Sequence, residues 1–343
     1  SINLSDCTLW PASTPFPSMT SSGACSLDEA ISKANADTDN RTITIIFSNA
    51  WSLSALAGLF GGDPVPTNSL TVNLPTINRP SGYPLVIDGA LGTGKISLAD
   101  GSTGNNTLTH FFRIGSNQPS QHVTIKNIAF TRLLRPGAVA ITTDVGTTPT
   151  PESGNIASLI IENNYFGTTD GITLTPNRAI WQAAKIFVEP SSVSDVIIRG
   201  NNVYNSVAGF EVGTADDFNS TSCLGEANGN YEITNNIIGL NKDKGIDRSY
   251  AGVNIQGAWS LFAVKVCNID RANIRSNTIG NSLGKLPSPL GLDTAIDIKN
   301  SSYIVRDNNI GIIKNSDGSF ATDLDWGIVG YGIKVEGHIG DFD

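Results

Sequence analysis

A short pattern recurs along this chain: an apolar strand, one or two asparagines, a second short strand and often a glycine. Successive copies read "LIIENNYFG", "VIIRGNNVYN", "YEITNNIIGLN", "ANIRSNTIGN" and "YIVRDNNIG". With the related "KNIAF", the last asparagines of these motifs are Asn127, Asn164, Asn202, Asn236, Asn277 and Asn309. The intervals of 37, 38, 34, 41 and 32 residues vary too much for helical repeats of fixed length, so the repeating unit is one of short strands.

A further apolar segment follows each marker at a variable distance. These segments are "GAVAIT" from Gly137, "KIFVEP" from Lys185, "AGFEVG" from Ala208, "AGVNIQG" from Ala251, "TAIDIKN" from Thr294 and "YGIKVEG" from Tyr331. Most alternate apolar and polar residues, which is typical of a strand buried on one face. One repeat therefore holds three short strands.

Three strands per coil, each too short to bury its own apolar face, predict an all-β fold of the right-handed parallel β-helix type. The turn between the first two strands needs a residue that tolerates the left-handed conformation and hydrogen-bonds to its neighbours, and Asn does both. Equivalent asparagines would stack at about 4.8 Å as an internal ladder. We therefore interpret the six marker asparagines as architectural rather than catalytic.

The N-terminal part predicts a cap. In "CSLDEAISKAN" (25–35), Leu27, Ala30, Ile31 and Ala34 fall on one helical face, and Ser26 stands where a helix would begin. Such a helix would cover the open apolar end of the first coil. The segments 69–77, 83–89, 94–100 and 109–115 are expected to form the first, less regular coils, which gives an arm and cap over 1–36 and a β-helix over 37–343.

Composition limits the functions that fit. A net charge of −9 without a cluster of Lys and Arg argues against nucleic acid as a partner. No apolar run approaches the ~20 residues that cross a bilayer, so we expect no transmembrane segment. The chain starts at Ser1, as after removal of a leader or of an initiator Met, and this fits an extracellular or cell-surface location.

The N-terminal stretch also carries a family resemblance. "CSLDEAISKAN", followed by "ITIIF", "LPTI" and "VIDG", resembles the CSLREA-type start of secreted bacterial and archaeal β-helix proteins, with Asp28 where Arg is usual. The later "IIENN", "IRGNN" and "VRDNN" are similar to the carbohydrate-binding and sugar-hydrolase repeat class. The resemblance implies a parallel β-helix at a secreted or surface location. It implies no defined activity, because this superfamily includes lyases, hydrolases, adhesins and structural proteins.

The four cysteines predict two disulfides. Cys223 lies fourteen residues after Gly209, and Cys267 lies fifteen after Gly252, which suggests equivalent places in neighbouring coils. Such places approach the separation of about 5.5 Å that a disulfide prefers, so we expect Cys223–Cys267, leaving Cys7 with Cys25. A metal site is the alternative, but the sequence has no C-x-x-C pair and only three histidines.

Catalytic candidates are few. Asp216 and Asp217 are the best carboxylate pair for a glycosidase, and with Glu226 they are also a weak candidate for calcium; no other cofactor is indicated. A lyase base and its partner could come from a charged stretch that holds Lys242, Lys244 and Arg248. We favour solvated, salt-bridged loops as the explanation of these residues, so we expect no catalytic residue in the chain.

The two ends suggest assembly instead. After "YGIKVEG" only "HIGDFD" follows, so no helix closes the last coil, while "SINLSDCTLW" at the start could add a strand to a neighbour's sheet. We therefore expect a non-enzymatic subunit that self-associates head-to-tail into a filament, sheath or surface layer. The alternatives are a polysaccharide lyase or glycoside hydrolase and a carbohydrate-binding adhesin, for which aromatics such as Trp181 would line a groove.

Overall fold

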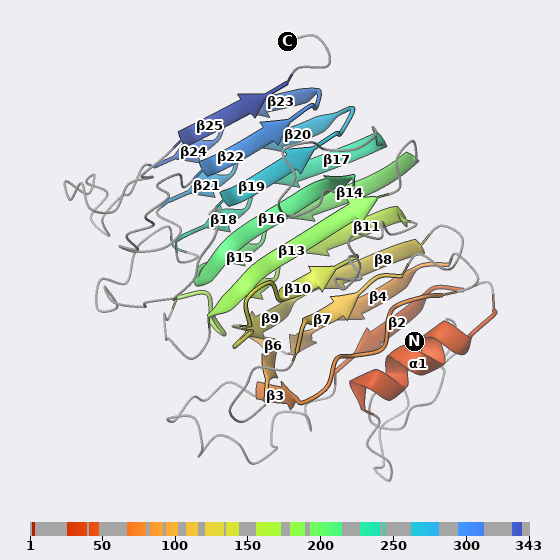
Figure 1. Ribbon diagram of the computed structural model, residues 1–343. Coiled ribbons are helices and arrows are strands. Elements are labelled where there is room, and N and C mark those ends of the chain that lie inside the picture. Colours follow the sequence, from red (N-terminus) through yellow and green to blue (C-terminus); the bar gives the residue numbers. More distant parts are fainter. Residues whose placement is uncertain are drawn as a thin grey trace.

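A computed structural model gives the fold. It describes residues 2–3, 26–39, 41–47, 67–79, 83–91, 94–101, 108–115, 121–133, 135–143, 156–172, 179–188, 193–214, 227–240, 243, 262–280, 294–311 and 331–337. These residues form one short helix and three sheets whose strands run parallel, with one antiparallel exception (Figure 1). The predicted all-β class is confirmed.

The first sheet has nine strands. In spatial order they are β1 (Ile2–Asn3), β2 (Ile43–Ile46), β4 (Leu85–Asp88), β8 (Gln121–Lys126), β11 (Ile156–Glu162), β14 (Val193–Arg199), β17 (Asn228–Thr234), β20 (Ala272–Arg275) and β23 (Tyr303–Arg306). The order follows the sequence, so each strand pairs with the strand one coil earlier and one coil later.

The second and third sheets repeat this arrangement. The second contains β3 (Thr67–Leu70), β6 (Gly94–Asp100), β9 (Ile128–Thr131), β12 (Tyr165–Phe166), β15 (Asn202–Val203), β18 (Ile237–Ile238), β21 (Thr278–Ile279) and β24 (Asn309–Ile310), with β5 (Ala90–Leu91) antiparallel to β6. The third contains β7 (His110–Arg113), β10 (Val139–Thr142), β13 (Ile180–Val188), β16 (Ser206–Thr214), β19 (Phe262–Cys267), β22 (Thr294–Lys299) and β25 (Tyr331–Glu336).

From β8 onward the chain visits the first, second and third sheets in turn, which makes a solenoid-like stack (Figure 1). We call each set of three consecutive strands a layer, and β23, β24 and β25 together form the terminal layer. Because side chains alternate along a strand, one set of positions in every strand faces the inside of the stack. The register keeps equivalent positions of successive layers directly above one another.

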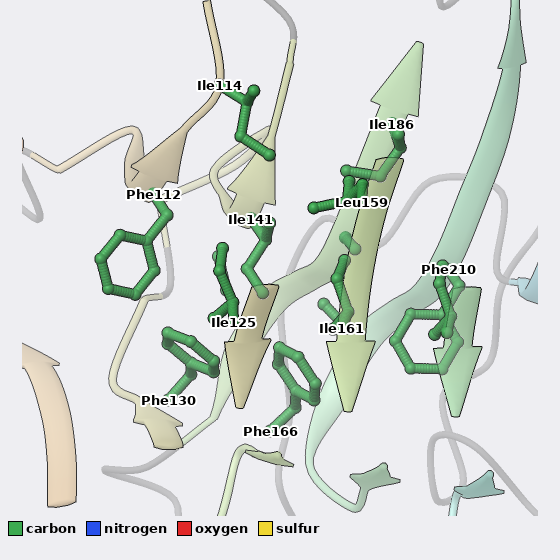
Figure 2. Close-up of a cluster of buried hydrophobic side chains, with 14 of the residues drawn as sticks. Phe112, Ile114, Ile125, Phe130, Ile141, Leu159, Ile161, Phe166, Ile186 and Phe210 are labelled. Carbon is green, nitrogen blue, oxygen red and sulfur yellow. The ribbon is translucent and has the colours of Figure 1, made fainter. Parts of the chain in front are cut away.

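The inside is filled by columns of like side chains. In the first sheet one buried column is isoleucine over seven strands: Ile45, Ile87, Ile125, Ile161, Ile198, Ile233 and Ile274. Phenylalanines fill the space between the sheets, where Phe130 stacks on Phe166 at 5.0 Å and meets Phe112 edge-on at 5.9 Å (Figure 2). Each layer is too small to bury these groups alone, so stacking creates the core.

Five asparagines form a hydrogen-bonded column at the corner between the first two sheets: Asn164, Asn201, Asn236, Asn277 and Asn308. At Asn236, for example, Oδ1 accepts the backbone N–H and the side-chain amide of Asn201, both at 3.0 Å. The preceding residue of each has a positive φ, as at Asn163 (53°) and Asp307 (57°). The corner therefore needs a left-handed residue followed by a buried asparagine.

Three markers from the sequence fall elsewhere. Asn202 and Asn309 lie one residue past the column, as the first residues of β15 and β24. Asn127 occupies the left-handed position itself (φ 58°), and its amide donates to Asp88 Oδ1 at 2.7 Å. The last Asn of a motif was the wrong marker, because the column residue is the one that directly follows the left-handed residue.

The predicted cap helix is confirmed as α1 (Leu27–Ala36), with all four residues of the expected face buried. It lies at the N-terminal end of the stack (Figure 1). Asn35 is the link: its Nδ2 donates to Thr76 O at 2.7 Å, and its Oδ1 accepts the Asn78 N–H at 2.9 Å. Ile77 forms a parallel β-bridge with Ile114, which directly follows β7. The Asn35 side chain therefore hydrogen-bonds to backbone groups at the first edge of the third sheet.

A buried arginine fixes the segment behind the helix. Arg79 is 1% exposed, donates to the carbonyls of Tyr83 and Pro84, and lies 3.7 Å from the Asp37 carboxylate. Asp37 directly follows α1, so the ion pair ties the helix to the first coils. Within the described residues, no helix has the length and apolar character of a bilayer span.

Candidate functional site

The predicted catalytic residues cannot be placed in a site. Asp216, Asp217, Lys242, Lys244 and Arg248 all lie outside the described residues, as does Glu226. Trp181, which the sequence suggested as part of a sugar platform, is in β13 and only 4% exposed. The enzyme and adhesin hypotheses therefore stay predictions.

Cys267 ends β19, is buried and is disulfide-bonded. Its in-register neighbour in the preceding layer is Gly213. The spacing argument was wrong because the strand of this layer is Phe262–Cys267, whereas the segment from Ala251 lies outside the described residues. Cys7, Cys25 and Cys223 also lie outside them, so both predicted pairings stay predictions.

The sequence reading missed a column of alternating charge on the third sheet. Five residues in successive strands are paired in register: Lys185, Glu211, Lys265, Asp297 and Lys334. They alternate along their strands with inward residues such as Ile186, Val212 and Ile296, so the column lies on the outer face of the sheet. Opposite charges at neighbouring positions favour this register over a shifted one.

At the centre of the column is a buried ion pair. Lys265 Nζ lies 2.7 Å from Glu211 Oε1, and Gln182 Nε2 donates to Glu211 Oε2 at 3.2 Å. Burial by itself would raise the pKa of Glu211, but the ammonium groups of Lys265 and Lys185 hold that pKa below its ordinary value. Glu211 is therefore a carboxylate at neutral pH, and its charge is compensated inside the protein.

Asp297 differs from the other acids of this face. Its in-register neighbours are Lys265 and Lys334. Lys265 forms its ion pair with Glu211, and Lys334 forms its ion pair with Glu336. Burial raises the pKa of Asp297 against the opposing effect of the lysines around it. Among the described residues Asp297 Oδ1 has no hydrogen-bond partner. This carboxyl is the least compensated group of the column, and it lies directly before the terminal layer.

The terminal layer exposes core positions. Ile333 and Val335 pair in register with Ile296 and Ile298, which are fully buried in β22. In β25 the same positions are 48% and 40% exposed. On β23 and β24, Tyr303, Val305 and Ile310 are likewise only partly buried against the core. We call these five residues the apolar end.

The N-terminal end has a different character. There α1 buries its apolar face inward and exposes Asp28, Glu29 and Ser32. Beside it β1, two residues long, pairs in parallel with β2 through Ile2 and Ile45. Of the first segment, which the sequence suggested as an added strand for another chain, the structure describes residues 2–3; they pair with the chain's own first sheet, and the pairing with another chain stays a prediction. Figure 1 shows α1 at one end of the stack and the terminal layer at the other. The first end is capped and exposes polar residues, and the second exposes apolar ones.

No three His, Cys, Asp or Glu side chains in the described ranges are grouped so that they could hold a metal ion. Comparisons of the chain with protein-family models, curated proteins and solved structures give no match. The charged column and the apolar end are therefore the two features from which a function can be argued.

Proposed function

We propose that the chain is a right-handed parallel β-helix that serves as an extracellular structural subunit and joins other copies head-to-tail through its apolar end. The right-handed form is supported by the general rule that crossovers between parallel strands have this hand in about 98% of cases. The strand sequence supports the winding, because each sheet receives one strand per coil.

The exposure of the terminal layer carries this proposal. Ile296 and Ile298 are buried because β25 covers them. Ile333 and Val335 are partly exposed, since no strand among the described residues covers β25. Burying one such side chain contributes roughly 1.5–3 kcal/mol. Among the described residues β23, β24 and β25 each pair with a strand on one side only, and pairing is the usual way in which the backbone groups of a strand edge are satisfied. A second copy docked on this layer can cover the apolar end and pair with the edge of β23.

A second copy supplies that layer in the correct direction only if it docks head-to-tail. Apart from β5, all strands of a given sheet in the stack point the same way, so the first strand of another copy can continue the parallel pattern beyond β23. A two-fold contact between two apolar ends would instead place antiparallel strands at the junction and close after two copies. Head-to-tail contacts leave a free end at each step, which produces a filament or layer.

The disulfide-bonded Cys267 supports the extracellular location. Disulfides persist in oxidising compartments, whereas cytosolic thiols are kept reduced. The low share of charged residues, 15%, and the acidic balance fit a secreted solenoid as well. Secretion of the full-length protein with an oxidised Cys267, measured by mass spectrometry of the non-reduced peptide, is the expected result.

Sedimentation and electron microscopy of the I333K/V335K variant test the assembly. The matched control is Val193→Lys, because Val193 is an equally β-branched residue, 76% exposed, on β14 in the middle of the stack. We expect wild type and V193K to form elongated particles and I333K/V335K to stay monomeric with an unchanged circular dichroism spectrum. A wild-type protein that remains monomeric at all accessible concentrations would overturn the proposal.

A further inference from the structure

The first sheet has two free ends of the same kind. At one end β1 lies beside β2, although Ile2 and Ile45 are more than forty residues apart in the chain. At the other end β23 pairs with β20 on one side only in the strand order of the described residues. Both end strands are parallel to the rest of the sheet. One edge can therefore receive the other in the geometry that every inner pair of strands already has.

We propose that β1 of one copy docks on β23 of the next, with Ile2 opposite Val305 and Asn3 opposite Arg306. This inference rests on the proposed function, and it names the surface and the register of the head-to-tail contact. The contact would make the first sheet continuous through the assembly, because β1 would pair with β2 of its own copy and with β23 of the neighbour.

The alternation of apolar and polar residues along β1 and β23 excludes any register that is shifted by one residue. Ile2 stands at the register position of the isoleucine column, and Val305 continues that column at the other end of the sheet. Asn3 and Arg306 stand at the neighbouring, outward positions. A shift by one residue would place Ile2 opposite Arg306 and an apolar residue among polar ones. The proposed register therefore keeps apolar positions inside and polar positions outside across the junction.

The third sheet is less suited to this contact. Its N-terminal edge near Thr76 and Asn78 already bonds to the Asn35 side chain, so α1 occupies the place where another strand would dock. The first sheet presents a strand at the same end, with its hydrogen-bonding edge parallel to that of β23. Local charge is also favourable, since Arg275 and Arg306 are stacked in register at one end and the first turn of α1 exposes two acids at the other.

Cysteine cross-linking tests the register. Paired parallel strands lie about 4.8 Å apart, within the Cα separation of about 4.4–6.8 Å that a disulfide spans. Under mild oxidation we expect the N3C/R306C variant to give a ladder of covalent multimers on non-reducing gels, while wild type and N3C alone do not. The matched control is N3C/I304C: Ile304 also faces outward on β23 but lies two residues away, at a separation of about 8 Å that is too long for the bond.

The outcomes separate this inference from the proposed function. If the variants sediment as assemblies but N3C/R306C forms no ladder, or N3C/I304C forms it instead, the register is wrong while self-association stands. Covalent dimers of R306C alone would indicate contact between two apolar ends and would overturn the inference. If nothing associates, the proposed function fails first. As a second readout, Ile2→Asp should weaken association about tenfold or more in sedimentation, because it places a charge at an apolar register position of the junction.

Discussion

Truncation of one column asparagine measures what holds neighbouring layers together. Asn236 is fully buried and makes four hydrogen bonds: it accepts twice from Asn201 and donates to Ile198 O and to Asn277 Oδ1. In Asn236→Ala the backbone N–H of Asn201 loses its acceptor, at a cost of about 1–3 kcal/mol, and the three further side-chain bonds lose about 0.5–1.5 kcal/mol each. The sum is a destabilisation of about 5 kcal/mol.

The assay is equilibrium unfolding in urea followed by circular dichroism, with amide hydrogen exchange at Asn201 as a local readout. The control is Asn230→Ala, because Asn230 is on β17 of the same layer but is exposed, and its side-chain bond to Glu232 lies at the surface. We expect N230A to remain within about 0.5 kcal/mol of wild type. Equal stabilities for N236A and N230A would refute the view that the buried column fixes the stacking.

Two other substitutions test the third sheet. Glu211→Gln should lower stability by roughly 3–5 kcal/mol at pH 7 because it removes the buried carboxylate that compensates the largely buried ammonium group of Lys265. The folded-state pKa of Glu211 is below its ordinary value of 4.5, so this stabilisation is present above pH 4.5 and is lost as pH falls through the folded-state pKa. The melting temperatures of wild type and E211Q should therefore converge in acid. A difference that stays constant with pH would contradict the role of the ion pair. Gly209→Ala drives a methyl group into the backbone carbonyl oxygen of Ala263 and should cost about 1–3 kcal/mol in urea unfolding. Gly332→Ala, in the same column, meets nothing closer than 3.8 Å and should be neutral.

The sequence was sufficient where a pattern had one physical solution. The recurrence of short apolar strands predicted parallel sheets, and the spacing of Leu27, Ala30, Ile31 and Ala34 predicted α1, because only a helix places these residues on one face. It was insufficient where two adjacent residues fitted the same pattern equally well. In "GNN" and "DNN" either asparagine could enter the column, and only the left-handed backbone at Gly200 and Asp307 decides which one does.

The site was harder to predict than the fold. "AGVNIQG" and "FAVKVC" both alternate like a strand, and the choice of the first shifted the expected position of Cys267. From β13 onward each strand of the third sheet contributes a single charge to the column, so no local cluster marks it in the sequence. Aligning the third strands of all repeats on their inward residues could have found Lys185, Glu211, Lys265, Asp297 and Lys334 in one column.

Because the two ends of the stack differ, a single molecule should unfold locally from one end before the other. In a stack where each layer contacts only its neighbours, opening starts where a layer has one neighbour instead of two. α1 and the Asp37–Arg79 ion pair protect the N-terminal side, while Ile333 and Val335 lie open to water on the other. A free subunit should therefore fray and be trimmed by proteases from β25 backward, and incorporation into a longer assembly would protect every subunit except the last.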